Sequence, residues 1–385
     1  MNNADLLFNK VIENSVFIHG KSTILEKEII QNRLIDPILS CHPNLTINNE
    51  SFQQREQKMK VKKKELKIII KEIDEENIDY LALKGLAMSK YYPKNILRQS
   101  NDFDLILKTP QDFWKLHRLF DKKGYEFTYL PMFSENHNSF LGLLKYEKVL
   151  ENNIKIRIEV NISHFIVAEG VWYVKDLWEQ SQFINFNGIS LKIPSDENNL
   201  IMLILESSGR DEMFVRDFID YYFIMQATSI NFKNIEKKLN NVFLKSVFSK
   251  FIAYSNEFNF KKVKRKNSKI ARELGIILPN LLKEKSMKKV YHRYLKFLGD
   301  NLIEKDILFG IVEKIDANVS TLTRFKQGLF CHFYLIDGEK IGQLKWVKFE
   351  KYYLLITPIG AFIATNFAFI EEDDEFKIKE FLRMV

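Results

Sequence analysis

The spacing of apolar residues divides the chain into stretches with different periods. Between Asn49 and Glu76, apolar residues recur at helical spacing beside a run of lysines, which predicts an amphipathic helix with an exposed basic face. Residues 80–83 are a short apolar run, and a second apolar run at 105–107 follows Asp102-Phe103-Asp104. Residues 155–160 alternate between polar and apolar, as strands do. A helical period returns at residues 113–123. This order of elements predicts a small mixed sheet flanked by helices.

Residues 301–385 differ in character from the rest of the chain. Short strand-like runs cover residues 311–315, 330–335 and 344–347, and Asp337-Gly338 predicts a hairpin between the second and the third. We therefore predict an α+β protein with four regions. They are a helical N-terminal region (1–78), a catalytic core (79–195), a helical domain (196–300) and a small β-rich C-terminal domain (301–385).

One long apolar run raises the question of a membrane span. Residues 352–370 hold 19 consecutive residues without a charge, close to the length of a spanning helix. The run also contains Pro358 and Gly360, which are turn-forming residues. Two buried strands around a Pro-Gly turn are therefore expected here, and no membrane span.

Composition is typical of a soluble globular protein. Hydrophobic residues make up 46% of the 385 residues and charged residues 28%. The two cysteines, Cys41 and Cys331, lie far apart and lack metal-ligand spacing, which favours reduced thiols in a cytosolic protein. The N-terminal residues do not follow the pattern of a secretory signal. We expect a cytoplasmic location.

The net charge of +8 is concentrated in one segment. Residues 261–296 hold 13 Lys or Arg against two Glu. Such a segment could bind an acidic partner, for example nucleic acid, a phosphorylated substrate or an anionic membrane surface. It could equally be a solvated helix face.

The candidate chemistry lies at the start of the predicted strand 102–107. Asp102 and Asp104 are two residues apart, so a strand would point both carboxylates to the same face. Carboxylates placed so closely repel each other unless a cation lies between them, and hard ions such as Mg²⁺ prefer oxygen ligands. If the strand that carries Glu159 lies alongside, the three carboxylates could hold one or two metal ions.

Two basic residues precede this strand. The strand 80–83 leads through Lys84-Gly85 into a helix, an arrangement in which free N–H groups often face a phosphate. Lys84 could contact that phosphate, or it could pair with Asp102 or Asp104. Arg98 could neutralise a triphosphate or orient a carboxylate.

A charged helix follows the predicted core. Arg216 and Asp220 are four residues apart, which is typical of a surface ion pair. The alternative is that Arg210 or Arg216 reaches the phosphates of a nucleotide.

These motifs, taken in order, resemble a known family. Leu83-Lys84-Gly85, Tyr92-Pro93, Arg98 and Asp102-Phe103-Asp104 are similar to the LKG…YP…R…D-x-D pattern of a largely uncharacterised bacterial nucleotidyltransferase family. That family belongs to the DNA polymerase beta-like superfamily, and the resemblance covers about residues 79–226. It implies a polymerase-beta-like core that binds Mg²⁺ or Mn²⁺.

The resemblance also implies roles for individual residues. The catalytic and metal-binding residues would be Asp102, Asp104 and Glu159. The nucleotide-binding residues would be Lys84, Gly85, Arg98 and Ser100.

The implied reaction moves a nucleoside monophosphate from a triphosphate, expected to be ATP, to an unknown small-molecule, peptide or protein acceptor, and releases pyrophosphate. Glu159 would help to deprotonate the acceptor. Two positions depart from the family pattern, because Ser100-Asn101 stands where Gly-Ser is usual and Asn161 where His is common. The alternative is therefore a catalytically degenerate protein that binds a peptide, protein or nucleic acid partner.

Overall fold

The computed structural model of the chain describes most of the region that carries the motifs. The described residues are 29–30, 33–41, 43–44, 46–47, 50–94, 96, 98, 102–128, 131–136, 139–167, 170–172, 177–186, 188–209, 214–239, 245, 248–249, 251–252, 322, 325, 331–365 and 372–384. Several features of the sequence analysis lie outside them, namely Ser100-Asn101, Arg210, the basic segment 261–296 and the predicted strand 311–315.

Helices surround a mixed sheet. The helices are α3 (Ile35–Cys41), α4 (Phe52–Glu75), α5 (Lys84–Met88), α6 (Pro110–Lys122), α7 (Asp196–Gly209), α8 (Val215–Ala227), α9 (Phe232–Lys238) and α15 (Glu372–Met384), with 3₁₀ turns η1 (Ser89–Tyr91) and η2 (Glu151–Asn153). The strands are β1 (Thr46–Ile47), β2 (Glu50–Ser51), β3 (Tyr80–Leu83), β4 (Asp102–Leu107), β5 (Glu126–Phe127), β6 (Met132–Asn136), β7 (Ser139–Val149), β8 (Lys155–Ile162), β9 (Phe165–Val167), β10 (Gly170–Trp172), β11 (Gln182–Phe186), β12 (Ile189–Ile193), β13 (Cys331–Asp337), β14 (Lys345–Phe349), β15 (Tyr352–Thr357) and β16 (Gly360–Thr365).

The largest sheet runs through both the core and the C-terminal region. Its order is β14-β15-β16-β13-β6-β7-β8-β4-β3, with β5 paired to β7. Strands β4 and β8 are parallel, and the other neighbouring pairs described in this sheet are antiparallel. This arrangement confirms the predicted α+β class, with a mixed sheet, flanking helices and a β-rich C-terminal region.

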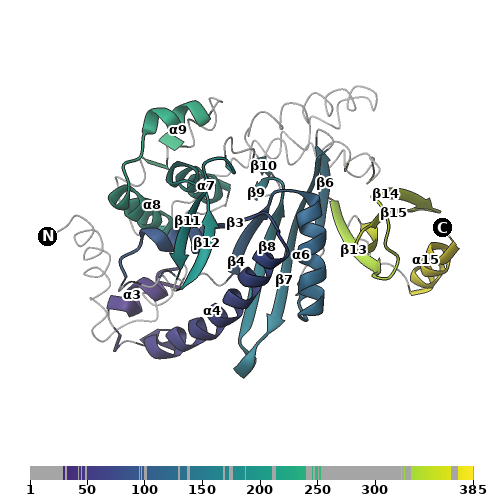
Figure 1. Cartoon of the computed structure of the whole chain (residues 1–385), viewed down its shortest axis with the longest axis horizontal. Helices are drawn as coiled ribbons and strands as arrows, with labels where there is room; N and C mark the ends of the chain where they lie inside the picture. Colours follow the sequence, from purple (N-terminus) through teal and green to yellow (C-terminus); the bar gives the residue numbers. More distant parts are fainter. Residues whose placement is uncertain are drawn as a thin grey trace, which may run out of the picture.

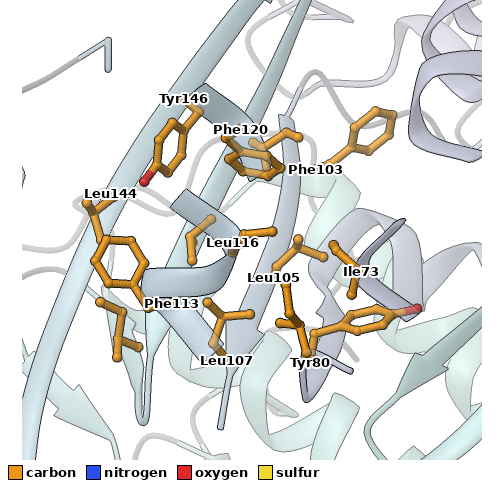
Figure 2. Packing of buried hydrophobic residues seen from close by; sticks show 14 of the residues in the cluster. Ile73, Tyr80, Phe103, Leu105, Leu107, Phe113, Leu116, Phe120, Leu144 and Tyr146 are labelled. Carbon is orange, nitrogen blue, oxygen red and sulfur yellow. The ribbon is translucent and has the colours of Figure 1, made fainter. Parts of the chain in front are cut away.

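Helices α4 and α6 cover one face of the core sheet (Figure 1). Both helices begin at a capping box, formed by Ser51 with Gln54 and by Thr109 with Asp112, which satisfies backbone N–H groups of the first turn. Their apolar faces pack against the inward residues of β3, β4, β7 and β8. Figure 2 shows this packing, to which α4 contributes Ile73, α6 contributes Phe113, Leu116 and Phe120, and β4 contributes Phe103, Leu105 and Leu107.

The opposite face of the same strands is covered by other elements. Leu81, Leu83 and Ile106 of this face pack with Phe165 of β9 and Met202 of α7. Because Phe103 and Leu105 fill the helix-covered side, the alternating residues Asp102 and Asp104 point to the α7 side. Alternate residues of β4 therefore face opposite sides of the sheet, with the apolar core on one side and the candidate site on the other.

The C-terminal strands pair differently from the prediction. Strand β13 pairs with β16 and β6, and β14 pairs with β15, so the hairpin expected at Asp337-Gly338 is wrong. The Asp337 carboxylate accepts hydrogen bonds from the backbone N–H groups of Glu339 and Lys340, at 2.8 and 3.1 Å. The turn that these hydrogen bonds stabilise takes the place of a two-residue hairpin loop between β13 and β14.

The uncharged run after residue 351 forms two strands, as expected. Strands β15 and β16 pair through a turn between Thr357 and Gly360. Gly360 has φ +136°, and an added Cβ would lie 2.8 Å from the Asp337 carbonyl oxygen, so this position requires glycine. Among the helices that the structure describes, none combines the length and apolar character needed to cross a bilayer.

Candidate active site

Strand pairing brings the predicted carboxylates together. In the parallel pair β4–β8, Asp104 lies opposite Glu159 and Asp102 lies opposite Arg157. Paired residues on neighbouring strands point to the same face, and so do residues two apart on one strand. Asp102, Asp104 and Glu159 therefore share the face of the sheet that α7 covers.

The ammonium group of Lys84 lies among these carboxylates. Its Nζ is 2.8 Å from Asp104 Oδ1 and 2.7 Å from Glu159 Oε1. Lys145 of β7 approaches Glu159 from outside, with Nζ 3.1 Å from Oε2. The side chain of Lys145 is 42% exposed, whereas that of Lys84 is 18% exposed. Lys84 is thus an internal cation, and Lys145 lies at the rim of the site.

The backbone at the end of β3 places Lys84 next to Asp104. Leu83 pairs with Asp104 in the antiparallel pair β3–β4, so the next residue emerges beside the carboxylate. Lys84 has φ +49°, in the left-handed region that a residue with a Cβ seldom adopts. Such strained residues concentrate at functional sites, where the surrounding structure holds them in place.

One carboxylate oxygen of the site lacks a partner. Asp102 Oδ1 is buried and makes no hydrogen bond to any described residue. A buried ionised oxygen without a partner is costly, and a bound cation would satisfy it. Within the described part of the chain, no three acidic, His or Cys side chains converge closely enough to be recognised as a metal centre. The Lys84 ammonium takes the space between two of the candidate ligands. The oxygen donors themselves are of the type that Mg²⁺ or Mn²⁺ prefers.

The charges perturb one another strongly. Burial raises the pKa of Asp104 to about 7, against the opposing effect of Lys84. Burial would also raise the pKa of Glu159, but the ammonium groups of Lys84 and Lys145 outweigh it and lower that pKa. Burial alone would lower the pKa of Lys84. Asp104, Glu206 and Glu159 raise it well above its ordinary value, so the ammonium stays charged.

Glu206 is a site residue that the sequence analysis missed. It lies on α7 one helical turn after Met202, which packs on the site face of the sheet. Its carboxylate acts electrostatically on both Lys84 and Asp104. The helical position next to the apolar run 200–205 was visible in the sequence, but the side of the sheet on which α7 docks was not.

Arg98 has a different environment from the one expected for a nucleotide contact. Its Nε and Nη2 atoms bind the two carboxylate oxygens of Asp220, each at 2.8 Å, and Tyr92 donates a hydrogen bond to Asp220 Oδ1 at 2.6 Å. The side chains of Arg98 and Asp220 are 5% and 1% exposed. The guanidinium group thus orients a carboxylate, and the expected surface pair of Arg216 with Asp220 is wrong because Asp220 is buried.

The remaining predicted positions lie as follows. Gly85 is buried in α5, directly after Lys84. Asn161 lies on the site face two residues beyond Glu159. It is fully buried, and its Nδ2 donates to the Leu105 carbonyl oxygen at 3.5 Å. The amide that replaces the common His is therefore part of the packed sheet.

Comparison with known proteins identifies the family. Residues 43–259 match a family described as "Uncharacterised nucleotidyltransferase". The chain belongs to this family. The match extends beyond residues 79–226 at both ends, so it includes α4 as well as the motifs. No curated protein matches the chain.

Three solved structures are similar to this family member at low identity. An antigenic nucleotidyltransferase-like protein from Paracoccidioides brasiliensis is 15% identical, with a TM-score of 0.36, over 51% of this chain and 90% of that one. The antibiotic-resistance factor ANT(2'')-Ia is 13% identical, with a TM-score of 0.31, over 50% and 97%. The Megavirus polyadenylate synthase is 12% identical, with a TM-score of 0.27, over 55% and 38%.

Proposed function

We propose that this protein is a metal-dependent nucleotidyltransferase that moves a nucleoside monophosphate from a triphosphate to an acceptor. The observation that carries the proposal is that the neighbouring strands β4 and β8 place Asp102, Asp104 and Glu159 on the same face of the sheet. The unpartnered oxygen of Asp102 adds a second argument, because it suits a cation better than an internal hydrogen bond. Membership in a nucleotidyltransferase family supports the reaction type.

The three carboxylates would hold a divalent cation, Mg²⁺ or Mn²⁺. When bound, such an ion neutralises phosphate charge and orients the α-phosphorus toward the attacking group. The acceptor oxygen forms a bond to the α-phosphorus, the bond to the bridging oxygen breaks, and pyrophosphate leaves. Most of the catalytic effect in such a transfer comes from positioning and electrostatics.

The side chains around the metal ligands have distinct proposed tasks. Glu159, kept ionised by two lysines, accepts a hydrogen bond from the acceptor hydroxyl and helps to remove its proton. Lys84 and Gly85 are the proposed phosphate contacts at the turn between β3 and α5, with Ser100 a further predicted contact. Arg98 is paired with Asp220 of α8 and so acts on the site only indirectly.

The first test is nucleotide incorporation. The protein would be incubated with each α-labelled triphosphate, Mg²⁺ or Mn²⁺ and a cell extract, and the labelled product would be identified by mass spectrometry. We expect ATP to be the donor. Asp104→Asn should lower transfer by at least about 10³-fold, because a lost transition-state charge contact costs that much.

Asp121→Asn is the matched control for this test. It makes the same chemical change on an exposed residue of α6, which lies on the other side of the sheet. Its transfer rate should equal that of the wild type. Undiminished incorporation by Asp104→Asn would reject the proposed ligand set.

A second candidate function follows from the position of Lys84. An ammonium group between Asp104 and Glu159 already neutralises part of the site, as a protein that binds a partner without catalysis could require. Calorimetry with each triphosphate, with and without Mg²⁺, separates the two functions. Nucleotide binding that depends on Mg²⁺ favours the enzyme, and its absence favours the binding protein.

A further inference from the structure

We propose that Lys84 is a built-in counter-ion that a divalent cation displaces from between Asp104 and Glu159. The inference rests on the proposed function, because it assumes that these carboxylates bind metal. It goes further by assigning Lys84 two successive positions, one on the carboxylates and one outside them.

The contacts of Lys84 place it in competition with a metal. Its Nζ uses Asp104 Oδ1 and Glu159 Oε1, two oxygens that lie opposite each other across the β4–β8 pair. A Mg²⁺ ion binds oxygens at about 2.0–2.1 Å, so it cannot share both oxygens with an ammonium group without strong repulsion between the cations. Metal binding at this pair therefore requires Lys84 to move.

Lys84 is suited to move, whereas the other cations near the carboxylates hold different positions. A lysine ammonium is a compact charge on a flexible four-carbon stem, and it is not locked in a planar two-point contact as the guanidinium of Arg98 is. Lys145 contacts the other oxygen of Glu159 from the exposed rim and can stay there. The left-handed backbone conformation of Lys84 fixes the direction of its Cα–Cβ bond but not the position of its ammonium group.

The charge balance favours an incoming divalent ion. Asp102, Asp104, Glu159 and Glu206 place four carboxylates in or beside the site. The ammonium groups of Lys84 and Lys145 contact Asp104 and Glu159, and Lys62 of α4 interacts electrostatically with Asp102. Asp102 Oδ1 has no partner among the described residues, so a divalent ion gains an oxygen that Lys84 does not use. The displaced ammonium can then pair with Glu206 or with a phosphate of the nucleotide. The two roles considered for Lys84 thus become two states of one side chain.

The decisive experiment measures Mn²⁺ affinity without nucleotide, by electron paramagnetic resonance of free Mn²⁺, on the full chain. Lys84→Met removes the charge and keeps the apolar stem. It should bind Mn²⁺ at least about tenfold more tightly than the wild type, because a like charge within a few ångströms shifts ionic equilibria by a factor of ten or more. An unchanged or weaker affinity in folded Lys84→Met overturns the inference.

Two controls locate the effect. Lys145→Met removes the other lysine on Glu159, and it should tighten Mn²⁺ binding by less than about threefold because its charge is solvent-screened. Adding Asp104→Asn to Lys84→Met should abolish the gain. A gain that survives without the Asp104 carboxylate would place the metal elsewhere and overturn the inference.

A second measurement uses the wild-type chain and does not depend on the folding of a variant. Lysine acetylation followed by mass spectrometry reports how accessible each ammonium group is. Saturating Mg²⁺ should raise labelling of Lys84 relative to Lys145, since the displaced group leaves its carboxylate partners. Equal labelling with and without saturating Mg²⁺ contradicts the displacement.

The outcomes separate this inference from the proposed function. Nucleotide incorporation by the wild type, together with unchanged Mn²⁺ affinity in Lys84→Met, overturns the displacement alone. Tighter Mn²⁺ binding by Lys84→Met, with no incorporation from any triphosphate, supports the displacement and overturns the transferase.

Discussion

Two clusters of buried acidic and basic side chains, one around Asp220 and one around Asp104, differ in how completely they are satisfied. In one, Asp220 receives two hydrogen bonds from Arg98 and one from Tyr92, and both of its oxygens are used. In the other, the Lys84 ammonium contacts both Asp104 and Glu159, Lys145 contacts the second oxygen of Glu159, and Asp102 Oδ1 has no hydrogen-bond partner among the described residues.

The difference separates a fully paired cluster from the candidate site. A buried ion pair with all its hydrogen bonds made leaves no capacity to bind a ligand, and its loss damages the fold. A cluster with more carboxylates than cations is unstable by itself, and it gains from an added cation. Aspartate and arginine residues that suggest phosphate binding in a sequence can therefore form either a structural ion pair or a ligand site. Which of the two they form depends on the groups that they contact in the folded protein.

The largest effect on stability should come from the satisfied cluster. Asp220→Asn leaves the Arg98 charge buried without its counter-ion, so we expect a loss of about 3–5 kcal/mol in the free energy of unfolding. Urea unfolding followed by circular dichroism measures it. Tyr92→Phe removes only the neutral hydrogen bond and should cost about 1 kcal/mol. Equal losses in the two variants would contradict the assigned role of the ion pair.

A third polar pair extends the comparison to a group that is buried in its neutral form. The ring of His117 lies between α6 and the sheet, with Nδ1 2.9 Å from the Tyr146 hydroxyl oxygen. Burial lowers the pKa of His117 to about 4. Between pH 6.5 and pH 4 the unfolded chain therefore binds a proton that the folded chain does not, and stability falls as the pH decreases.

This shift predicts a loss of about 2 kcal/mol of folding stability between pH 7.5 and pH 5. The sign follows because the folded pKa lies below the unfolded value, so the protein is most stable when the ring is neutral in both states. Urea unfolding at the two pH values measures the loss. His117→Gln should show a smaller decrease over the same interval, and an identical decrease would exclude His117 as its source.

The candidate metal site should respond to substitution in the opposite way from the Asp220 cluster. Asp104→Asn removes one of several neighbouring carboxylates, while Lys84 keeps its contact with Glu159. We expect the free energy of unfolding to change by less than about 1 kcal/mol, since active sites often sacrifice stability for function. Thermal unfolding measures it. A loss as large as that of Asp220→Asn would make the cluster structural.

The smallest effect is expected at a surface cluster on the same sheet. Glu147 contacts Lys155 and Arg157 at 2.6 Å each, but both cations are more than half exposed. Glu147→Gln should change stability by about 0.5 kcal/mol or less, because water and salt screen exposed pairs. The difference from the wild type should shrink further in 1 M NaCl. A loss of stability comparable to that of Asp220→Asn would show that the short distance between the charges matters more for stability than their burial.

The sequence predicted those parts of the molecule that depend on local pattern. The alternation around Asp102 and Asp104, and around Glu159, correctly gave two strands, and their side-by-side pairing places the three carboxylates on one face. The turn in the uncharged run 352–370 was also predicted, because Pro358 and Gly360 act over a few residues.

Contacts between distant segments were not predictable in the same way. Arg98 and Asp220 are 122 residues apart, and the sequence around either residue does not show that the two side chains pair. The position of Glu206 beside the candidate site depends on which face of the sheet α7 covers. The pairing of β13 with β16 and β6 depends on the packing of the whole sheet, whereas Asp337-Gly338 indicates only that a turn occurs.

The junction between β6 and β13 has a consequence for how the family region can be isolated. Strand β13 joins the C-terminal strands to β6 of the core (Figure 1). Phe133 pairs with Cys331 and Met132 with His332, and the Phe333 N–H donates a hydrogen bond to the Pro131 carbonyl oxygen at 2.8 Å. A protein truncated at residue 259, where the family match ends, would leave β6 as an open edge, with the ring of Phe133 stripped of Phe333 and Phe362. Uncovered edges with apolar neighbours recruit strands from other molecules. The segment that matches the family, expressed by itself, should therefore self-associate, because the C-terminal strands that cover the β6 edge would be missing.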